Sequence, residues 1–271
     1  MLIQRFKENK VGDFELNRYN HPRFANGVCE EYPTNEGDVA VVLEYHSYEC
    51  VYVTFKDENT PKDFRLKCQL GELRKGRVKN PFKRQSHGVG YKGFGIYLTA
   101  KNGKNTNVWM MWDNMLSRCY NPKDSSYTNY GGRGVTVCKY WHSFQNYACW
   151  VYQNKRENFE LDKDLLSPEA KMYSEETCCF LPRDINSFVK TNLDAGVWFN
   201  GKKYVAQINH KGRNKIIGRY LDRSSALIAF IEEKCEVAKS LAVSFKNEIS
   251  NEAYSKLLNY KDRYEKLNQD F

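Results

Sequence analysis

The sequence predicts an α+β protein built from three modules. Short runs of strand-forming residues fill the N-terminal third, apolar stripes with helical spacing occupy the middle, and three strand signals precede a long helical stretch near the C-terminus. The 271 residues, 41% of them hydrophobic, suffice for more than one small core. We expect a β-rich module at residues 1–85, a central domain containing a ββα unit at 86–192, and a three-stranded sheet with a helix and helical tail at 193–271.

Two strand signals predict the N-terminal module. Val39–Leu43 is an uninterrupted apolar run, and Val51–Phe55 consists of strong strand formers. A turn-like segment at 57–61 separates them from a further extended segment at Phe64–Leu70. The glycine-rich stretch from Gly88 to Gly95 matches no phosphate-binding pattern, and we expect it to form a linker or a closely packed loop.

The central module begins with a helix over residues 106–122, where apolar side chains recur every three or four positions until Asn121-Pro122 ends the run. The remaining elements that we expect there are, in order, a strand at Val135–Cys138, a helix at Ser143–Gln153, strands at Phe159–Leu165 and Cys178–Leu181, and a short helix from Pro182 to Val189.

The C-terminal module shows three strand signals, at Val197–Phe199, Tyr204–Ile208 and Ile216–Tyr220, with the hairpin signal Asn200-Gly201 between the first two. We expect a helix capped by Ser224 to pack across this sheet, and a further helix from Ser250. The predicted buried stripe of the first helix is Leu227, Ile228, Ile231, Cys235 and Ala238. The buried layer should include Ala206, Ile208, Ile217, Leu227 and Ile231.

Charge is distributed unevenly along the chain, whose formal net charge is +9. Residues 24–55 hold six acids and no Lys or Arg, residues 62–104 hold twelve Lys or Arg against two acids, and residues 195–220 hold six Lys or Arg and no acid. Basic stretches interleaved with aromatic residues are typical of proteins that bind a polyanion such as nucleic acid. The alternative is that these faces are merely solvated.

The nine cysteines are expected to be reduced thiols, because the N-terminal residues have no apolar signal core. Cys119, Cys138, Cys149 and Cys178 could gather a zinc ion, but they lack paired spacing, and core packing is the expected role. No apolar run approaches 18 residues, so we expect no membrane-spanning segment and no membrane partner.

The C-terminal module resembles the Apetala-type (ethylene-response-factor) DNA-binding domain. The resemblance is carried by Gly196-Val197, Tyr204–Ile208, Ile217–Tyr220, Ser225-Ala226 and Ala229-Phe230. It implies a sheet that enters the major groove of double-stranded DNA and a helix that supports the sheet from behind.

Alternation along the middle strand puts Lys203, Val205, Gln207 and Asn209 on the face away from the helix. The candidate DNA contacts are Lys203, Gln207, Asn209, Lys211, Arg213, Lys215 and Arg219. Gly218 is a position at which a bulge would change this alternation.

The middle of the chain resembles phage-encoded HNH-type, homing-like endonucleases, which often carry an Apetala-type module at the C-terminus. The motifs, in order, are Trp112–Tyr120, Tyr130–Cys138, Leu161–Asp164, Tyr173–Cys178 and Asn186. The resemblance implies a DNA endonuclease that uses Mg²⁺ or another divalent metal, in the cytoplasm of an infected bacterial host.

Matched to that family, Asp162 falls on the metal-binding aspartate, Asn186 on the helix ligand and Lys163 on the general-base histidine. A lysine is protonated at neutral pH and is a poor base, so the HNH motif is degenerate here. Asp164 is an extra carboxylate, expected on the same strand face as Asp162. The candidate catalytic residues are thus Asp162, Lys163 and Asp164, and the candidate metal ligands Asp162, Asp164 and Asn186; the alternative is that the two aspartates face solvent or form ion pairs.

A second class of function is a catalytically inactive interaction protein. In that interpretation the acidic region from Glu30 to Glu49 binds a host or phage protein.

Overall fold

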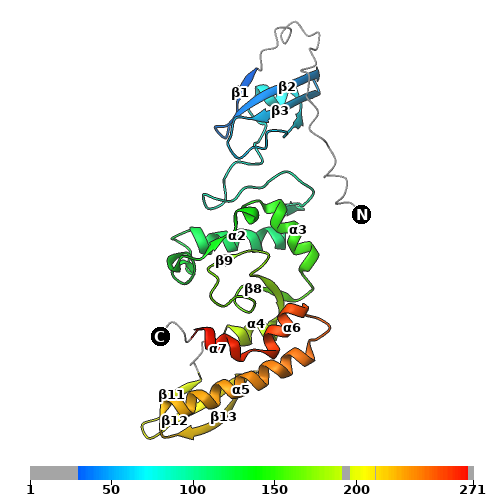
Figure 1. Cartoon of the computed structure of the whole chain (residues 1–271). Coiled ribbons are helices and arrows are strands. Elements are labelled where there is room, and N and C mark those ends of the chain that lie inside the picture. The colour runs from blue at the N-terminus through cyan, green and yellow to red at the C-terminus, as the bar shows by residue number, and fades with distance from the viewer. Residues whose placement is uncertain (1–29, 191–195, 211, 268–271) are drawn as a thin grey trace. The chain divides into compact units, whose positions relative to one another are not determined.

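The computed structural model of the chain describes residues 30–190, 196–210 and 212–267 (Figure 1). They divide into two compact units, the first within residues 1–83 and 91–94 and the second within 84–90 and 95–271. Helices and several small sheets occur together, which confirms the α+β class. Within these described ranges, no helix is both long enough and apolar enough to cross a bilayer.

The first unit is a four-stranded antiparallel sheet with strand order β1-β2-β3-β4. Its elements are β1 (Glu31–Pro33), β2 (Val39–Ser47), β3 (Cys50–Phe55), β4 (Leu66–Cys68) and the short helix α1 (Leu70–Arg74). Alternate residues of β3, Val51, Val53 and Phe55, are buried against α1, where Leu73 is 1% exposed. The strands expected at Val39–Leu43 and Val51–Phe55 are confirmed, and the third expected strand is shorter because α1 begins at Leu70.

The second unit begins with a two-stranded hairpin, β5 (Ala100–Lys101) and β6 (Lys104–Asn105), which the sequence analysis did not predict. Its turn residues Asn102 and Gly103 both have positive φ, 52° and 73°, as an Asn-Gly turn of this kind requires.

The predicted helices of the central module are confirmed. They are α2 (Asn107–Tyr120) and α3 (Phe144–Asn154), joined through the short 3₁₀ helices η2 (Tyr127–Asn129), η3 (Gly131–Arg133) and η4 (Lys139–His142) and by the strand β7 (Thr136–Val137). Thr106 caps α2, since its hydroxyl accepts the Trp109 N–H at 3.2 Å. Trp112 and Phe144 are fully buried between the two helices, and the Trp112 indole donates to the Trp141 carbonyl at 2.7 Å.

A strand–loop–strand–helix unit follows, as the sequence predicts. Its elements are β8 (Phe159–Asp162), β9 (Met172–Tyr173), β10 (Cys179–Pro182) and α4 (Arg183–Val189). β8 pairs antiparallel with β10, with Asp162 opposite Cys179, while β9 pairs parallel with β7. The first strand ends at Asp162 rather than at Leu165, because the Asp162 carboxylate accepts the backbone N–H groups of the turn that follows.

The C-terminal module is a three-stranded antiparallel sheet with order β11-β12-β13, and the helix α5 packs on it as predicted (Figure 1). The strands are β11 (Val197–Phe199), β12 (Tyr204–His210) and β13 (Arg213–Tyr220); α5 (Arg223–Ser244), α6 (Asn251–Leu258) and α7 (Lys261–Leu267) follow. Ala206 and Ile208 are buried toward α5, and Ile217, Leu227 and Ile231 are partly buried there. Gly196 permits the close fit, because a Cβ at this position would lie 2.1 Å from the Phe230 ring.

Two expectations for α5 were wrong. The helix is capped by Asp222 rather than by Ser224, since the Asp222 carboxylate accepts the Ser225 N–H at 2.8 Å. The buried face also agrees only in part with the predicted stripe: Ala238 is buried and Leu227 and Ile231 are partly buried, but the buried residues are Ala226, Phe230, Lys234, Ala238, Leu241 and Ala242. Ile228, expected inside, is 57% exposed. A lysine and several alanines at buried positions concealed this face from the apolar pattern.

Lys234 is the charged residue of that face, and it is 1% exposed. Its amine donates to the Phe188 carbonyl at 3.2 Å and lies 4.4 Å from the Phe188 ring centroid and 5.9 Å from that of Tyr260. Burial, with a smaller contribution from the nearby Arg263 guanidinium, lowers the pKa of Lys234 to about 8. The amine therefore joins α5 to α4 and to Tyr260, which directly precedes α7.

We expect the free energy of unfolding of the wild type to rise relative to that of Lys234→Met between pH 8 and pH 10. Because the folded-state pKa is lowered, the unfolded state binds the proton more tightly, and the cost of the buried charge is present in full below pH 8 and is lost above it. The shift to about 8 corresponds to a change on the order of 3 kcal/mol. Urea denaturation across this pH range measures the change, with the exposed Lys239→Met as control; a constant difference between the wild type and Lys234→Met would contradict the expectation.

Candidate functional site

The Asp162 carboxylate lies at the end of β8, within the ββα unit, and is 2% exposed. Its Oδ2 accepts the backbone N–H of Leu165 at 2.7 Å and that of Asp164 at 2.9 Å. Burial raises the pKa of the Asp162 carboxyl, while the Leu165 N–H opposes this rise. The geometry gives this aspartate a role in shaping the turn after the strand.

Lys163 and Asp164 form an ion pair in that turn. The Lys163 amine lies 2.6 Å from Asp164 Oδ1 and also donates to the Ala170 carbonyl at 2.8 Å. The expectation that Asp164 shares a strand face with Asp162 was wrong, because β8 has ended and Asp164 lies in the turn. Its carboxylate is half-exposed and is neutralised by a neighbouring ammonium.

Asn186 is fully buried on α4, and its amide donates to Glu160 Oε2 on β8. The Asn186 Oδ1 is buried and has no hydrogen-bond partner in the described part of the chain. Lys190 lies 3.7 Å from the same Glu160 carboxylate. Glu160 was not among the predicted site residues, although its position two residues before Asp162 on the predicted strand puts both side chains on one face.

The predicted metal ligands Asp162, Asp164 and Asn186 therefore each have a different partner. The set does not fit a divalent cation as arranged, because an ammonium already holds Asp164 and two N–H groups hold Asp162 Oδ2. Among the described residues, no group of three or more His, Cys, Asp or Glu side chains is placed to hold a metal ion.

The described cysteines are free, and Cys119 and Cys178 are buried in the central core, as expected of packing residues.

His46, His87 and His142 each contact a group other than Asp162. His46 contacts Glu44 at 3.1 Å, His87 contacts Asp113 at 3.3 Å, and His142 Nε2 lies 3.1 Å from the Val137 carbonyl. Arg263 of α7, which the sequence did not single out, instead approaches this region: its guanidinium donates to the Asp164 carbonyl at 3.1 Å and the Val189 carbonyl at 3.3 Å. It ties the turn after β8 to the end of α4.

The face of the β11–β13 sheet that points away from α5 forms the second candidate site. Trp198, Val205 and Arg219 lie opposite one another across the three strands. Trp198 is 50% exposed and Arg219 is exposed, whereas Val205 between them is 1% exposed. Because directly opposed residues on neighbouring strands project to the same face, the indole and the guanidinium flank the valine.

Amide side chains continue this face toward the open end of the hairpin. Gln207 lies opposite Ile216, and the Asn209 amide donates to Asn214 Oδ1 at 2.6 Å. We call the surface made by Trp198, Val205, Gln207, Asn209, Asn214, Ile216 and Arg219 the outer sheet face. The strands themselves contain no Asp or Glu.

A bulge in β13 separates the predicted basic contacts into two groups. The register shifts beside Ile217, next to the glycine that the sequence had flagged. Lys215 is therefore opposite Ile208 on the helix side, and its amine lies 2.7 Å from Glu233 of α5. Arg213, two residues earlier, alternates to that same side and is exposed.

The two remaining predicted contacts lie in the turns. Lys203 is exposed in the turn before β12, where its backbone N–H donates to Asn200 Oδ1 at 2.9 Å. Lys211 lies outside the described residues.

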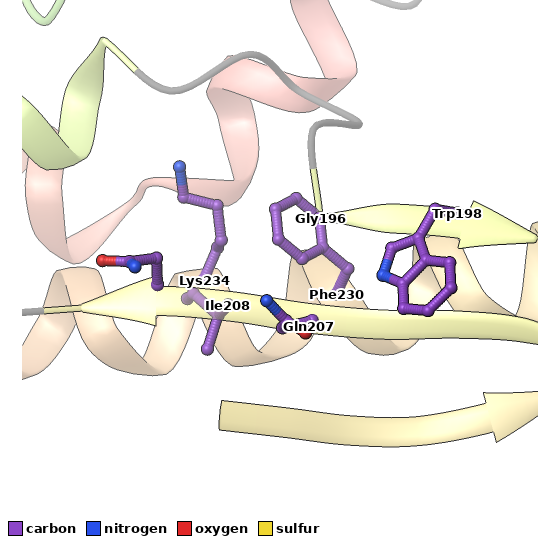
Figure 2. A pocket seen from close by; sticks show the side chains of 7 residues that line it. Gly196, Trp198, Gln207, Ile208, Phe230 and Lys234 are labelled. Atoms are coloured by element: carbon purple, nitrogen blue, oxygen red, sulfur yellow. The ribbon is translucent and has the colours of Figure 1, made fainter. Parts of the chain in front are cut away.

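A pocket of about 110 Å³ opens where β11 begins (Figure 2). Trp198 and Gln207 reach it from the strands, and Phe230 and Lys234 reach it from α5. This volume is well below the roughly 300 Å³ at which small-molecule sites usually start. The pocket holds at most a few water molecules, and we assign it no ligand.

The acidic stretch of the first unit is paired with basic residues that follow it in the sequence. Glu31 pairs with Lys56, Glu44 with Arg65 at 2.5 Å, Glu36 with Lys79 at 2.6 Å, and Asp38 with Lys83 at 3.2 Å. These pairs neutralise carboxylates that the interaction-protein alternative needs, as well as part of the basic stretch at 62–104.

Comparison of the chain with protein-family models, curated proteins and solved structures finds no match. Function is therefore inferred from the geometry described above.

We expect Asp162→Ala to lower the free energy of unfolding by about 1–3 kcal/mol, because two backbone N–H groups lose their acceptor. Asp162→Asn keeps an acceptor oxygen and should cost less. Urea denaturation compares both with Glu169→Ala, an exposed acid of the same loop. Equal stability of Asp162→Ala and Glu169→Ala would contradict the structural role.

Proposed function

We propose that the chain is a sequence-preferring nucleic-acid-binding protein that binds double-stranded DNA through the outer sheet face. The observation that carries the proposal is the division of this small sheet into two faces: α5 covers one, and the other presents Arg219, Gln207 and Asn209 beside an exposed indole. Arginine and amide side chains are the groups that bind base edges and phosphates most effectively.

The size and charge of the module support the same proposal. Strands lie about 4.8 Å apart, so a three-stranded sheet fits the roughly 12 Å width of a major groove. No carboxylate of the three strands opposes an approaching phosphate. In the described part of the chain Arg219 has no ion-pair partner, in contrast to Lys215.

Metal-dependent DNA cleavage by the central ββα unit is the second candidate function. It is favoured by the antiparallel β8–β10 pair followed by α4, and by the buried acceptor oxygen of Asn186 that lacks a partner. It is opposed by Lys163, which occupies the general-base position and neutralises Asp164. Binding without cleavage is therefore the function that the geometry supports best.

We expect Arg219→Ala to weaken DNA binding by about 1–3 kcal/mol if the guanidinium contacts a base, and to relax the sequence preference at that base. Lys215→Ala is the matched control, because it removes the same charge from the same strand but from the side that faces Glu233. Fluorescence anisotropy with labelled duplexes across a salt series measures both variants. The slope of log K against log[salt] gives about −0.9 per phosphate contacted.

Three results would contradict the sheet proposal. These are affinity that does not depend on salt, equal losses in the two variants, and unchanged binding when Arg219 and Gln207 are both replaced by alanine. Equal losses would mean that only net charge matters.

For the second candidate, we expect supercoiled plasmid to stay intact with Mg²⁺ or Mn²⁺ at high protein concentration, because Lys163 replaces the general-base histidine and is paired with Asp164. Gel analysis of the nicked form measures this. A metal-dependent product made by the wild type and lost in Asn186→Ala would overturn the expectation and establish an endonuclease.

A further inference from the structure

Arg118 lies on α2, within the Trp112–Tyr120 motif, and the function proposed above does not use it. Its Cζ is 5.0 Å from the ring centroid of Tyr130 and 5.0 Å from that of Tyr173. The two rings are 6.4 Å apart, with 27° between their planes. Contact with two aromatic rings holds the guanidinium in one direction, so its N–H groups are positioned before any ligand arrives.

The glycine-rich loop after α2 explains how Tyr130 reaches this position. A Cβ at Gly131 would lie 2.1 Å from the Cys119 carbonyl oxygen, so only glycine allows the loop to close on the end of the helix. Gly134 ends the loop with a positive φ of 79°. The Tyr130–Gly134 motif thus serves to place an aromatic ring beside Arg118.

The Arg118 charge has no counterion in the described part of the chain. Its Nε is buried without a hydrogen-bond partner, and the residue is otherwise only partly buried, so the end of the guanidinium remains within reach of a ligand. Asp124, whose pKa Arg118 helps to lower, is instead bound by the Ser117 hydroxyl at 2.6 Å and the Ser126 N–H at 2.8 Å. An anion that accepts from Arg118 would satisfy a donor that the fold leaves unpaired.

A second cation lies near the same ring. The Lys163 amine is 5.9 Å from the Tyr173 centroid and comes from the turn after β8, where Asp164 and the Ala170 carbonyl accept two of its three N–H bonds. The ring of Tyr173 therefore lies between elements that carry two positive charges and one half-exposed carboxylate.

We propose that Arg118 is a phosphate-binding residue, with Tyr130 and Tyr173 as its positioning residues. The planar guanidinium matches two oxygens of one phosphate, and pre-positioned N–H groups lose little freedom on binding. The phosphate belongs to the backbone of the nucleic acid, so the site rests on the proposed function and adds a contact by the central module to that of the sheet.

The test is anisotropy titration of the full chain with a labelled duplex over a salt series. Arg118→Gln should weaken binding about five- to tenfold and reduce the salt slope by about one unit. Arg118→Lys keeps the charge and should preserve the slope while still weakening binding, because lysine lacks the planar fork. Lys123→Gln, which removes an exposed charge close by, should weaken binding less than Arg118→Gln. Wild-type affinity and slope in Arg118→Gln would overturn the proposal.

A second measurement does not depend on how well Arg118→Gln folds. In ¹⁵N-arginine-labelled chain, the Nε–Hε resonance that disappears in Arg118→Lys reports on this site. Its shift on addition of duplex supports the nucleic-acid source. A shift with inorganic phosphate but not with duplex would overturn that source in favour of a small phosphate compound, and no shift with either would overturn the site.

The two proposals fail separately. If Arg219→Ala weakens DNA binding and Arg118→Gln does not, the sheet interface is kept and the Arg118 site is removed. If Arg118→Gln weakens binding and Arg219→Ala does not, the sheet interface is removed.

Discussion

The packing of α5 against several partners at once holds much of the second unit together. The helix contacts β12 and β13 of the sheet and also α6 and α7. Residues of α4, among them Phe188 and Val189, belong to the same apolar cluster as Ala206 of the sheet and Phe230 of the helix. The sheet thus shares its core with the ββα unit, and because α5 occupies one sheet face, only the other is open to a ligand.

The regular elements could be predicted because their signals are local. The apolar spacing of α2 and α3 and the Asn200-Gly201 hairpin each depend on a few adjacent residues. The same kind of signal was present at Asn102-Gly103 and was overlooked. The buried face of α5 could not be identified in this way, because Lys234 occupies it and its partners Phe188 and Tyr260 are distant in sequence. The bulge beside Ile217 was flagged, but its effect on Lys215 required the register.

The candidate sites differ in how much of their geometry could be predicted from the sequence. The resemblance placed Asp162 and Asn186 in a ββα unit, and the structure has that unit, yet the partners of these side chains are Leu165 and Glu160. The Asp162 bonds to the turn are local, whereas the bond from Asn186 to Glu160 and ion pairs over 20 to 45 residues, such as Lys83 with Asp38, follow from tertiary packing. The cluster of Arg118, Tyr130, Tyr173 and Lys163 could not be predicted for the same reason, because these residues come from separate segments of the chain.

The extra residue in β13 has a consequence for how this module can diversify. Side chains on a strand alternate between two faces, so Ile217 reverses the order for every residue before it in the strand. If Ile217 were paired in a regular ladder instead, Lys215 and Arg213 would turn outward and Asn214 and Ile216 inward, while Arg219 kept its place. Substitutions that abolish the bulge would therefore exchange an amide-and-aliphatic surface for a cationic one, whereas deletion of Ile217 would leave both faces as they are.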